Sequence, residues 1–361
     1  MALTRISIQD FRNHADTALE DTARFNLLVG ANGAGKTNVL EALSLLAPGR
    51  GLRRAKLPEM ARMGGSGGFT VAARLQPADG EEPVQLGSWI DPAQPTRRRV
   101  RINGADASAL ALAEWLSVRW LTPAMDGLFT DSAGARRRFL DRLVLATAPA
   151  HARLSSRYET ALRDRNRLLS DEALPDPRWL DALEAQLAEL GAQIATHRRE
   201  LVERLNAALL AQDDGHFPRP ALAIEPVGPE EAEPLAKALR DNRGAERRAG
   251  RTLLGPHRAE LAVTLADKGV PAARASTGEQ KAMLIAITLA HGSFATQGRA
   301  GVLLLDEVAA HLDPDRRKAL FDRLEANGEQ VWITGTERTP FDAILSRAAV
   351  WDVSGGALRR I

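Results

Sequence analysis

The stretch GANGAGKTNVLEAL, residues 30–43, follows the apolar run FNLLV and continues into a helix-like pattern. Gly30, Gly33 and Gly35 allow the backbone to wrap closely around phosphate groups. Lys36 can meet the β- and γ-phosphates of a nucleotide, and Thr37 can ligate magnesium. A glycine-rich turn that binds no nucleotide is the alternative, but the strand before the motif and the helix after it favour a phosphate-binding loop. The predicted loop comprises Gly30, Ala31, Asn32, Gly33, Ala34, Gly35, Lys36, Thr37 and Asn38.

A second motif, GVLLLDE at residues 301–307, consists of an almost wholly apolar run that ends in two carboxylates. Such a run is typical of a strand that is covered on both faces in a parallel sheet. Asp306 can hold the magnesium shell, and Glu307 can orient an attacking water. The alternative for the aspartate is a cap on the next helix. Beside the loop, the motif predicts a hydrolysis site with Lys36, Asp306 and Glu307 as catalytic residues and with Thr37 and Asp306 as metal ligands.

A third motif, ASTGEQKAMLIAITLA at residues 275–290, opens a strongly apolar helix. The hydroxyls and amides of Ser276, Thr277 and Gly278 form a second anion site, 240 residues after Lys36. One nucleotide does not obviously need two such sites. Taken alone, the motif is best explained as an ordinary helix cap.

Composition limits the classes of protein to consider. The chain has 361 residues, a formal net charge of +2 and no cysteine, so disulfides and thiolate metal sites are excluded. No window of eighteen apolar residues occurs, and the start MALTRISIQDF does not resemble a signal peptide. We therefore expect a cytoplasmic protein with no membrane partner. With a small net charge, attraction to nucleic acid has to come from local patches.

The pattern along the chain predicts an α/β fold with an insertion. Short alternating segments bounded by Gly, Pro or Asp indicate strands near both chain ends. Between them, Leu180, Leu187 and Ile194 belong to a run of apolar residues at three-four spacing, which is typical of a helical hairpin or short coiled coil. We predict a head built from residues 1–134 and 250–361 and an inserted helical arm over residues 135–249.

The three motifs together resemble an ABC-type P-loop ATPase head. The resemblance is carried by GANGAGKT, STGEQ, LLLDE and Asp313 in HLDPDRR. Members of that class split their sites across a dimer. The resemblance implies an ATP-dependent homodimer in which Ser276 and Gly278 of one chain face the γ-phosphate held by Lys36 of another, with Asp313 at the same interface.

Within that class the chain resembles the RecF family of SMC-like DNA replication and repair proteins. Four further segments carry this likeness: DFRNH (10–14), WLTPAMDGLF (120–129), RRRFLDRLV (136–144) and GPHRAEL (255–261). The resemblance implies that Arg12 and Asn13 lie beside the nucleotide phosphates. It also implies ATP and Mg²⁺ as cofactors, a clamp on single-stranded, gapped or junction DNA, recombinational repair at stalled forks, SOS induction, and RecR and RecO as partners in recombinase loading.

Two departures from transporter-type heads affect the expected rate. The signature reads STGEQ rather than SGGQ, and ITGTE places Thr336 where transporter heads carry a switch histidine. Because Glu307 is retained, hydrolysis is expected, and the threonine predicts that it is slow. A transporter motor or a full-length SMC chain fits less well, since the insertion is too long for the first and too short for the second. A nucleotide-dependent protein scaffold without DNA contact stays open as the alternative to a DNA clamp.

Candidate DNA contacts are clusters of arginine and lysine without a recognition-helix or zinc signature, so only phosphate contacts are expected. The candidates are Arg53, Arg54, Lys56, Arg97, Arg98, Arg99 and Arg101. Each run could equally be a solvated face. Arg136–Arg138 could contact DNA or have a structural role, and His257 in GPHR is more typical of a packed residue than of a catalytic one.

Overall fold

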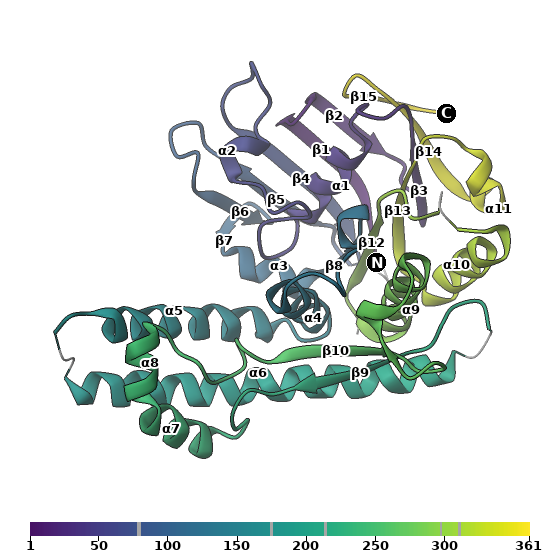
Figure 1. The fold of residues 1–361 in the computed structure, drawn as a ribbon. Helices are drawn as coiled ribbons and strands as arrows, with labels where there is room; N and C mark the ends of the chain where they lie inside the picture. Colours follow the sequence, from purple (N-terminus) through teal and green to yellow (C-terminus); the bar gives the residue numbers. More distant parts are fainter. Residues whose placement is uncertain (78–80, 174–175, 213–214, 297, 310–311) are drawn as a thin grey trace. The chain divides into compact units, whose positions relative to one another are not determined.

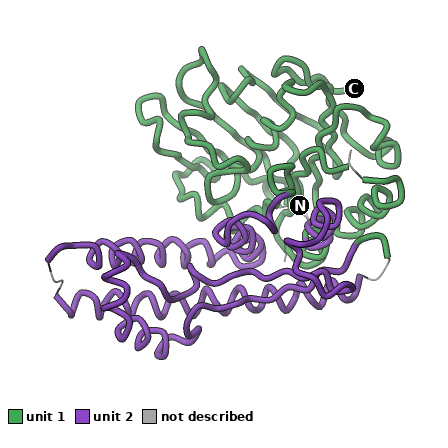
Figure 2. Tube along the Cα trace, viewed as in Figure 1, with its two compact units in different colours: residues 1–126, 214–217, 288–361 green, residues 127–213, 218–287 purple. Residues whose placement is uncertain are grey.

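The structure, a computed structural model, describes residues 1–361 except 78–80, 174–175, 213–214, 297 and 310–311. The chain divides into two compact units (Figure 2). Unit 1 contains residues 1–126, 214–217 and 288–361, and unit 2 contains residues 127–213 and 218–287. Both chain ends therefore belong to unit 1. The head and arm boundaries drawn from the sequence pattern stay a prediction.

A mainly parallel sheet forms the centre of unit 1 (Figure 1). Its strands, in spatial order, are β15 (Ala357–Arg360), β14 (Ala348–Ser354), β3 (Phe25–Val29), β13 (Gln330–Gly335), β12 (Ala300–Leu305) and β8 (Leu116–Leu121). Only the β14–β15 pair is antiparallel. Every residue of β3, β8, β12 and β13 is buried, as expected of strands covered on both faces. The carboxyl ends of β3, β13 and β12 therefore meet at one edge, with β13 in the middle.

A second, antiparallel sheet completes unit 1. Its spatial order is β2 (His14–Glu20), β1 (Ala2–Phe11), β4 (Phe69–Gln76), β5 (Val84–Ile90), β6 (Arg98–Ile102) and β7 (Ala105–Ala107). Its inner face, with Ile6, Ile8 and Val71, joins the same apolar cluster as Val39 and Leu43 of α1 (Lys36–Ser44). This sheet confirms the strands predicted near the first chain end.

The remaining elements of unit 1 are short helices, 3₁₀ turns and a longer helix. They are α2 (Leu57–Met60), α3 (Leu112–Trp115), α10 (Pro314–Asn327), α11 (Asp342–Leu345) and the short 3₁₀ turns η1 (Ala109–Ala111), η2 (Pro123–Met125) and η5 (Thr339–Phe341). Helix α10 begins directly after Asp313 of the HLDPDRR motif.

Unit 2 is built around a long helical hairpin. Helix α4 (Ala133–Thr147) leads into α5 (Ala150–Ser170), which lies beside α6 (Pro177–Ala211) (Figure 1). Helix α6 has 35 residues, so at 1.5 Å per residue it is about 52 Å long. Leu180, Leu187 and Ile194 are buried, which confirms the predicted apolar seam. Gly191 lies within that seam, and a Cβ there would come within 3.1 Å of Leu235.

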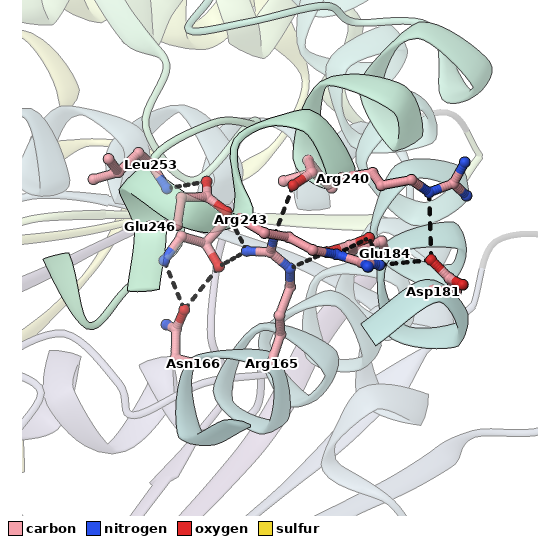
Figure 3. A network of polar contacts seen from close by, with 10 residues as sticks. Arg165, Asn166, Asp181, Glu184, Arg240, Arg243, Glu246 and Leu253 are labelled. Atoms are coloured by element: carbon pink, nitrogen blue, oxygen red, sulfur yellow. Dashed lines mark hydrogen bonds and ion pairs between the residues drawn. The ribbon is translucent and has the colours of Figure 1, made fainter. Parts of the chain in front are cut away.

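A network of buried charges stabilises the hairpin and the helices packed on it (Figure 3). Arg165 of α5 is fully buried and pairs with Glu184 of α6 at 2.9 Å and with Glu246 at 2.5 Å. Arg243 pairs with Glu184 and, at 2.6 Å, with Asp181. Because each buried charge has a partner of opposite sign, removing one member would leave an uncompensated charge.

The return segment of unit 2 contains a strand that the sequence pattern did not predict. Strand β9 (Pro220–Glu225) lies in the proline-rich stretch and pairs with β10 (Glu260–Leu265), which also pairs with β11 (Val270–Pro271). Helices α7 (Ala232–Asp241) and α8 (Arg243–Ala249) lie between β9 and β10 in the chain, and the short turn η3 (Ala272–Arg274) precedes α9 (Thr277–Ala295). Among the described residues, no helix is long and apolar enough to cross a membrane.

Candidate nucleotide-binding site

The glycine-rich loop connects β3 to α1 and curls around the amine of its own lysine. Lys36 Nζ donates to the carbonyl oxygens of Gly30 at 2.7 Å and Ala31 at 3.0 Å. Gly33 and Gly35 have φ values of 80° and 116°, which side chains rarely allow. The loop therefore presents backbone N–H groups and a lysine at the start of a helix, an arrangement suited to polyphosphate.

The turn between β1 and β2 supports this loop from one side. Asn13 Nδ2 donates to the carbonyl of Ala34 at 3.0 Å, and Asn13 Oδ1 accepts from Asn38 Nδ2 at 2.7 Å. A Cβ on Gly35 would lie 2.7 Å from Asn13 and 3.0 Å from His14. Asn13 thus lies against the loop, and Gly35 is required for that approach.

Arg12, at the same turn, is occupied by other partners. Its Nε and Nη2 atoms both donate to the buried carboxylate of Glu41 at 2.8 Å, and Nη1 donates to the carbonyl of Glu59 at 2.7 Å. Arg53 also donates to Glu41, at 3.0 Å, and to Asn38 at 2.7 Å. A phosphate contact by Arg12 stays a prediction, and it would require Arg12 to leave Glu41.

The acidic motif meets the loop at the carboxyl edge of the parallel sheet. Asp306 follows β12, is 6% exposed, and accepts a hydrogen bond from the Thr37 hydroxyl at 2.8 Å. The two predicted metal ligands thus lie together, and hard oxygen donors are what Mg²⁺ prefers. The described residues contain no cluster of three His, Asp or Glu side chains that could hold a metal alone. This pair therefore fits Mg²⁺ bound jointly with nucleotide phosphates.

Sequence reasoning missed the residue that connects the two carboxylate positions. Thr334, at the end of β13, is fully buried and donates to Asp306 Oδ1 at 2.8 Å. Its hydroxyl oxygen accepts from the backbone N–H of Glu307 at 2.9 Å. Thr336, which the resemblance singled out, is exposed just beyond the strand. The hydroxyl at the end of the apolar run QVWIT is visible in the sequence, but its two hydrogen-bond partners are not.

The signature segment, which contains Ser276 and Gly278, belongs to unit 2, and these two residues are exposed. Ser276 and Glu279 form a reciprocal cap: the Ser276 N–H and hydroxyl both donate to Glu279 at 2.8 Å, and the Glu279 N–H donates to Ser276 Oγ at 3.3 Å. A hydrogen bond from Lys268 and those from Ser276 lower the pKa of Glu279 to about 2. A Cβ on Gly278 would meet no described atom within 4 Å.

Asp313 and His257, two other positions considered in the sequence, are explained by contacts within their own units. Asp313 caps α10, accepting from the Arg316 N–H at 2.9 Å, and this hydrogen bond lowers its pKa. His257 Nδ1 lies 2.7 Å from the Tyr158 hydroxyl, and its Nε2 lies 3.2 Å from the carbonyl of Thr252. Because a carbonyl only accepts, Nε2 carries the proton and Tyr158 donates to Nδ1. Burial lowers the pKa of His257 to about 4, so it is a neutral packed residue.

Strand alternation separates the arginines of β6. Arg98 faces inward, where its guanidinium donates to Ser88 Oγ at 2.8 Å and to the carbonyls of Gly49 at 2.8 Å and Ala47 at 3.0 Å, and burial lowers its pKa to about 10. Arg99 and Arg101 face outward, where both pair with Asp106 and lie over the Trp89 ring. Arg98 is therefore a structural residue of the sheet and not part of its outer face.

Comparisons with known proteins assign the family. The model of the RecF/RecN/SMC N-terminal domain matches residues 2–350. The DNA replication and repair protein RecF of Rhizobium leguminosarum bv. trifolii is 45% identical over 378 residues, with 99% of this chain and 98% of that protein covered. The chain belongs to the RecF family. RecF of Mesorhizobium japonicum is 47% identical over 373 residues, covering 99% of this chain and 97% of its own.

Solved structures agree with this family at the level of the fold. RecF solved with ATP, described as a recombination mediator of the RecFOR pathway, has a TM-score of 0.85 at 23% identity, covering 100% of this chain and 99% of that one. The Smc head of Pyrococcus furiosus has a TM-score of 0.55 at 16% identity, covering 99% and 95%. The predicted SMC-like ABC-type head is confirmed, and RecF and Smc heads share it.

Proposed function

We propose that this RecF family member is an ATP-dependent DNA-binding protein of recombinational repair and replication-fork maintenance. The observation that carries the proposal is the hydrogen bond between Thr37 and Asp306, which joins the phosphate-binding loop to the acidic motif across 269 residues of sequence. Such a pairing is needed to hold a Mg²⁺–nucleotide complex. ATP is the favoured nucleotide because RecF relatives have been solved with it.

Each residue of the site has a separate task in this proposal. Backbone amides of residues 31–37 and the Lys36 amine hold the phosphates. Thr37 and Asp306 would hold Mg²⁺, which supplies charge neutralisation at the β- and γ-phosphates. Glu307 orients the attacking water. With Thr336 in place of a switch histidine, hydrolysis is slow, and the protein acts as a switch more than as a metabolic enzyme.

A second chain completes the site. The Ser276 cap and the open backbone at Gly278 are exposed at the start of a 19-residue helix, and the N–H donors of a helix N-terminus favour an anion. ATP held by Lys36 of one chain would meet these donors from the other, with Asp313 at the same interface. ATP then stabilises only the closed dimer, and hydrolysis reopens it.

DNA contact is placed on the outer face of the antiparallel sheet. Ser7, Ala72 and Gly87 are neighbours across β1, β4 and β5 and form a row of small residues. Longer side chains on both sides of this row border a hollow of about 650 Å³ whose lining includes Arg5, Arg74, Arg101 and Trp89. The rows bordering it are four residues apart along each strand, about 13 Å. Arginines in such a hollow suit a phosphate backbone.

The other cations of the DNA proposal are Arg53, Arg54, Lys56, Arg97 and Arg99; Arg98 is left out because its guanidinium is bonded inside unit 1. The pathway follows from the family. We infer RecR and RecO as partners, since solved relatives act in the RecFOR pathway, and a cytoplasmic role that supports SOS induction and recombinase loading.

A DNA-binding titration at several salt concentrations tests the proposal. Native protein with ATP should bind gapped or single-stranded DNA, and log affinity should fall linearly with log salt concentration. Replacing Arg74 and Arg101 with Ala should weaken binding and flatten that slope by about 1 to 2. Lys318→Ala, on the exposed side of α10, is the control. ATP-dependent dimers that bind no DNA at any salt concentration would favour the nucleotide-dependent scaffold instead.

A further inference from the structure

We propose that Thr334 is a positioning residue of the hydrolysis site, which sets the turn that carries Asp306 and Glu307. The inference rests on the proposed function for the chemistry of those two carboxylates, and on the structure alone for the hydrogen bonds. Strand β13 lies between β3 and β12, so its last residues lie between the phosphate-binding loop and the acidic motif. Thr334 is the buried hydroxyl at that point.

One hydroxyl group connects both carboxylate-bearing residues. The Thr334 O–H donates to Asp306 Oδ1 at 2.8 Å, while the same oxygen accepts from the Glu307 N–H at 2.9 Å. Asp306 is also held through its backbone, since its N–H donates to the carbonyl of Leu121 at 2.9 Å. A buried group that both donates and accepts fixes the distance between the Asp306 side chain and the Glu307 backbone.

The backbone at Glu307 needs such a restraint. Its φ of 53° lies in the left-handed region, which is uncommon and strained for a residue other than glycine. The hydrogen bond to Thr334 helps to hold this conformation, and therefore the direction in which the Glu307 side chain leaves the chain. Without the hydroxyl, the Glu307 N–H would lose its described acceptor.

Thr334 has a different role from Thr37, the other residue that donates a hydrogen bond to Asp306. Asp306 Oδ1 accepts from both Thr37 and Thr334. Thr37 is a predicted metal ligand, so its hydroxyl has a second task when nucleotide is bound. Thr334 is not a predicted metal ligand, so we expect its hydrogen bond to Asp306 to persist when nucleotide is bound. Removing the Thr334 hydroxyl should therefore disturb Asp306 and Glu307 without removing a group that contacts the nucleotide.

Hydrogen exchange in nucleotide-free protein tests the inference independently of ATP. Thr334→Val keeps the shape and removes the hydroxyl, and it should accelerate exchange of the Glu307 amide at least about tenfold. Thr334→Ser should stay close to the native rate. Thr339→Val, at an exposed threonine beyond the strand, is the matched control. A Glu307 amide that exchanges at the native rate in Thr334→Val would overturn the inference.

Kinetics provide the second measurement. Thr334→Val should lower kcat about tenfold and raise the Mg²⁺ concentration for half-maximal turnover, with KM for ATP changed less than threefold; Thr334→Ser should restore most of kcat. Native values for Thr334→Val in both kcat and Mg²⁺ dependence would contradict a positioning role. Failure of the proposed function has a different signature, because the native protein itself would then neither bind nor hydrolyse ATP, whatever the exchange experiment shows.

Discussion

The two predicted halves of the nucleotide site differ in how completely each is bonded within its own unit. On the loop side, Lys36 donates to two loop carbonyls, and Thr37 and Thr334 both donate to Asp306. On the signature side, the Ser276 N–H and hydroxyl donate to Glu279, its carbonyl accepts from the Gln280 N–H, and the space next to Gly278 is open. The loop side can bind a nucleotide by exchanging existing partners. The signature side is exposed and leaves the space beside Gly278 open, which is the property expected of a surface that acts on another chain's nucleotide.

The largest expected effect comes from removing the base on the loop side. Glu307→Gln should reduce single-turnover ATP hydrolysis by about 10²-fold or more, because the amide cannot accept a proton from water. ATP affinity should change less than about threefold. Glu337→Gln, at an exposed glutamate in the segment after β13, is the matched control. Hydrolysis at the native rate in Glu307→Gln would remove the glutamate from the reaction.

The lysine of the loop should dominate affinity. Lys36→Ala should weaken ATP binding about 30-fold, equivalent to about 2 kcal/mol, because a charge-assisted contact to phosphate is lost. Calorimetric titration measures this directly. Lys318→Ala, an exposed lysine on α10 that pairs with Asp322, should bind ATP like the native protein. Equal affinity in the two variants would contradict the assignment.

The signature side should behave differently from the loop side. Ser276→Arg should leave the ATP affinity of dilute protein within about twofold, while turnover falls at least about tenfold and no longer rises with protein concentration. Ser293→Arg, at an exposed position further along α9, is the control. A loss of ATP affinity in dilute Ser276→Arg protein would mean that the serine acts within its own chain.

The smallest expected effect concerns the hydrogen-bonded cap that Ser276 and Glu279 form at the start of α9. The pKa of Glu279 is lowered to about 2, first by the hydrogen bond from Lys268 and then by those from Ser276. Since the folded pKa lies below the usual 4.5, the cap contributes stability above about pH 4.5 and loses it as pH falls through about 2. An NMR titration should show the Glu279 pKa rising more in Lys268→Ala than in Ser276→Ala. The reverse order would mean that the serine, and not the lysine, is the main partner.

Local motifs were predictable from the sequence, while the contacts between them were not. The loop, the apolar strand before Asp306 and the helix after Ser276 each follow from short-range pattern, and the structure has them. The role of Thr334 depends on β13 lying between β3 and β12. Strand order of this kind is set by packing over the whole unit, so a threonine at the end of QVWIT could not be singled out.

Two further differences have simple physical causes. The run Arg97–Arg101 was treated as one patch, but side chains alternate between faces along a strand, so Arg98 points to the core and bonds the carbonyls after α1. Strand β9 lies among four prolines of the stretch 217–229, within the predicted helical arm, where no strand was predicted. Its partner β10 follows it by about forty residues, and such a distant pairing leaves no local signal.

We propose that one chain supplies only half of each working site. Mass measured by light scattering with and without ATP tests it for native protein, Lys36→Ala, Ser276→Arg and an equimolar mixture of the two variants. We expect ATP-dependent doubling of the native mass, no doubling for either variant alone, and partial recovery in the mixture, because a mixed dimer keeps one intact pair of Lys36 and Ser276. A native protein that binds ATP and stays monomeric would contradict it.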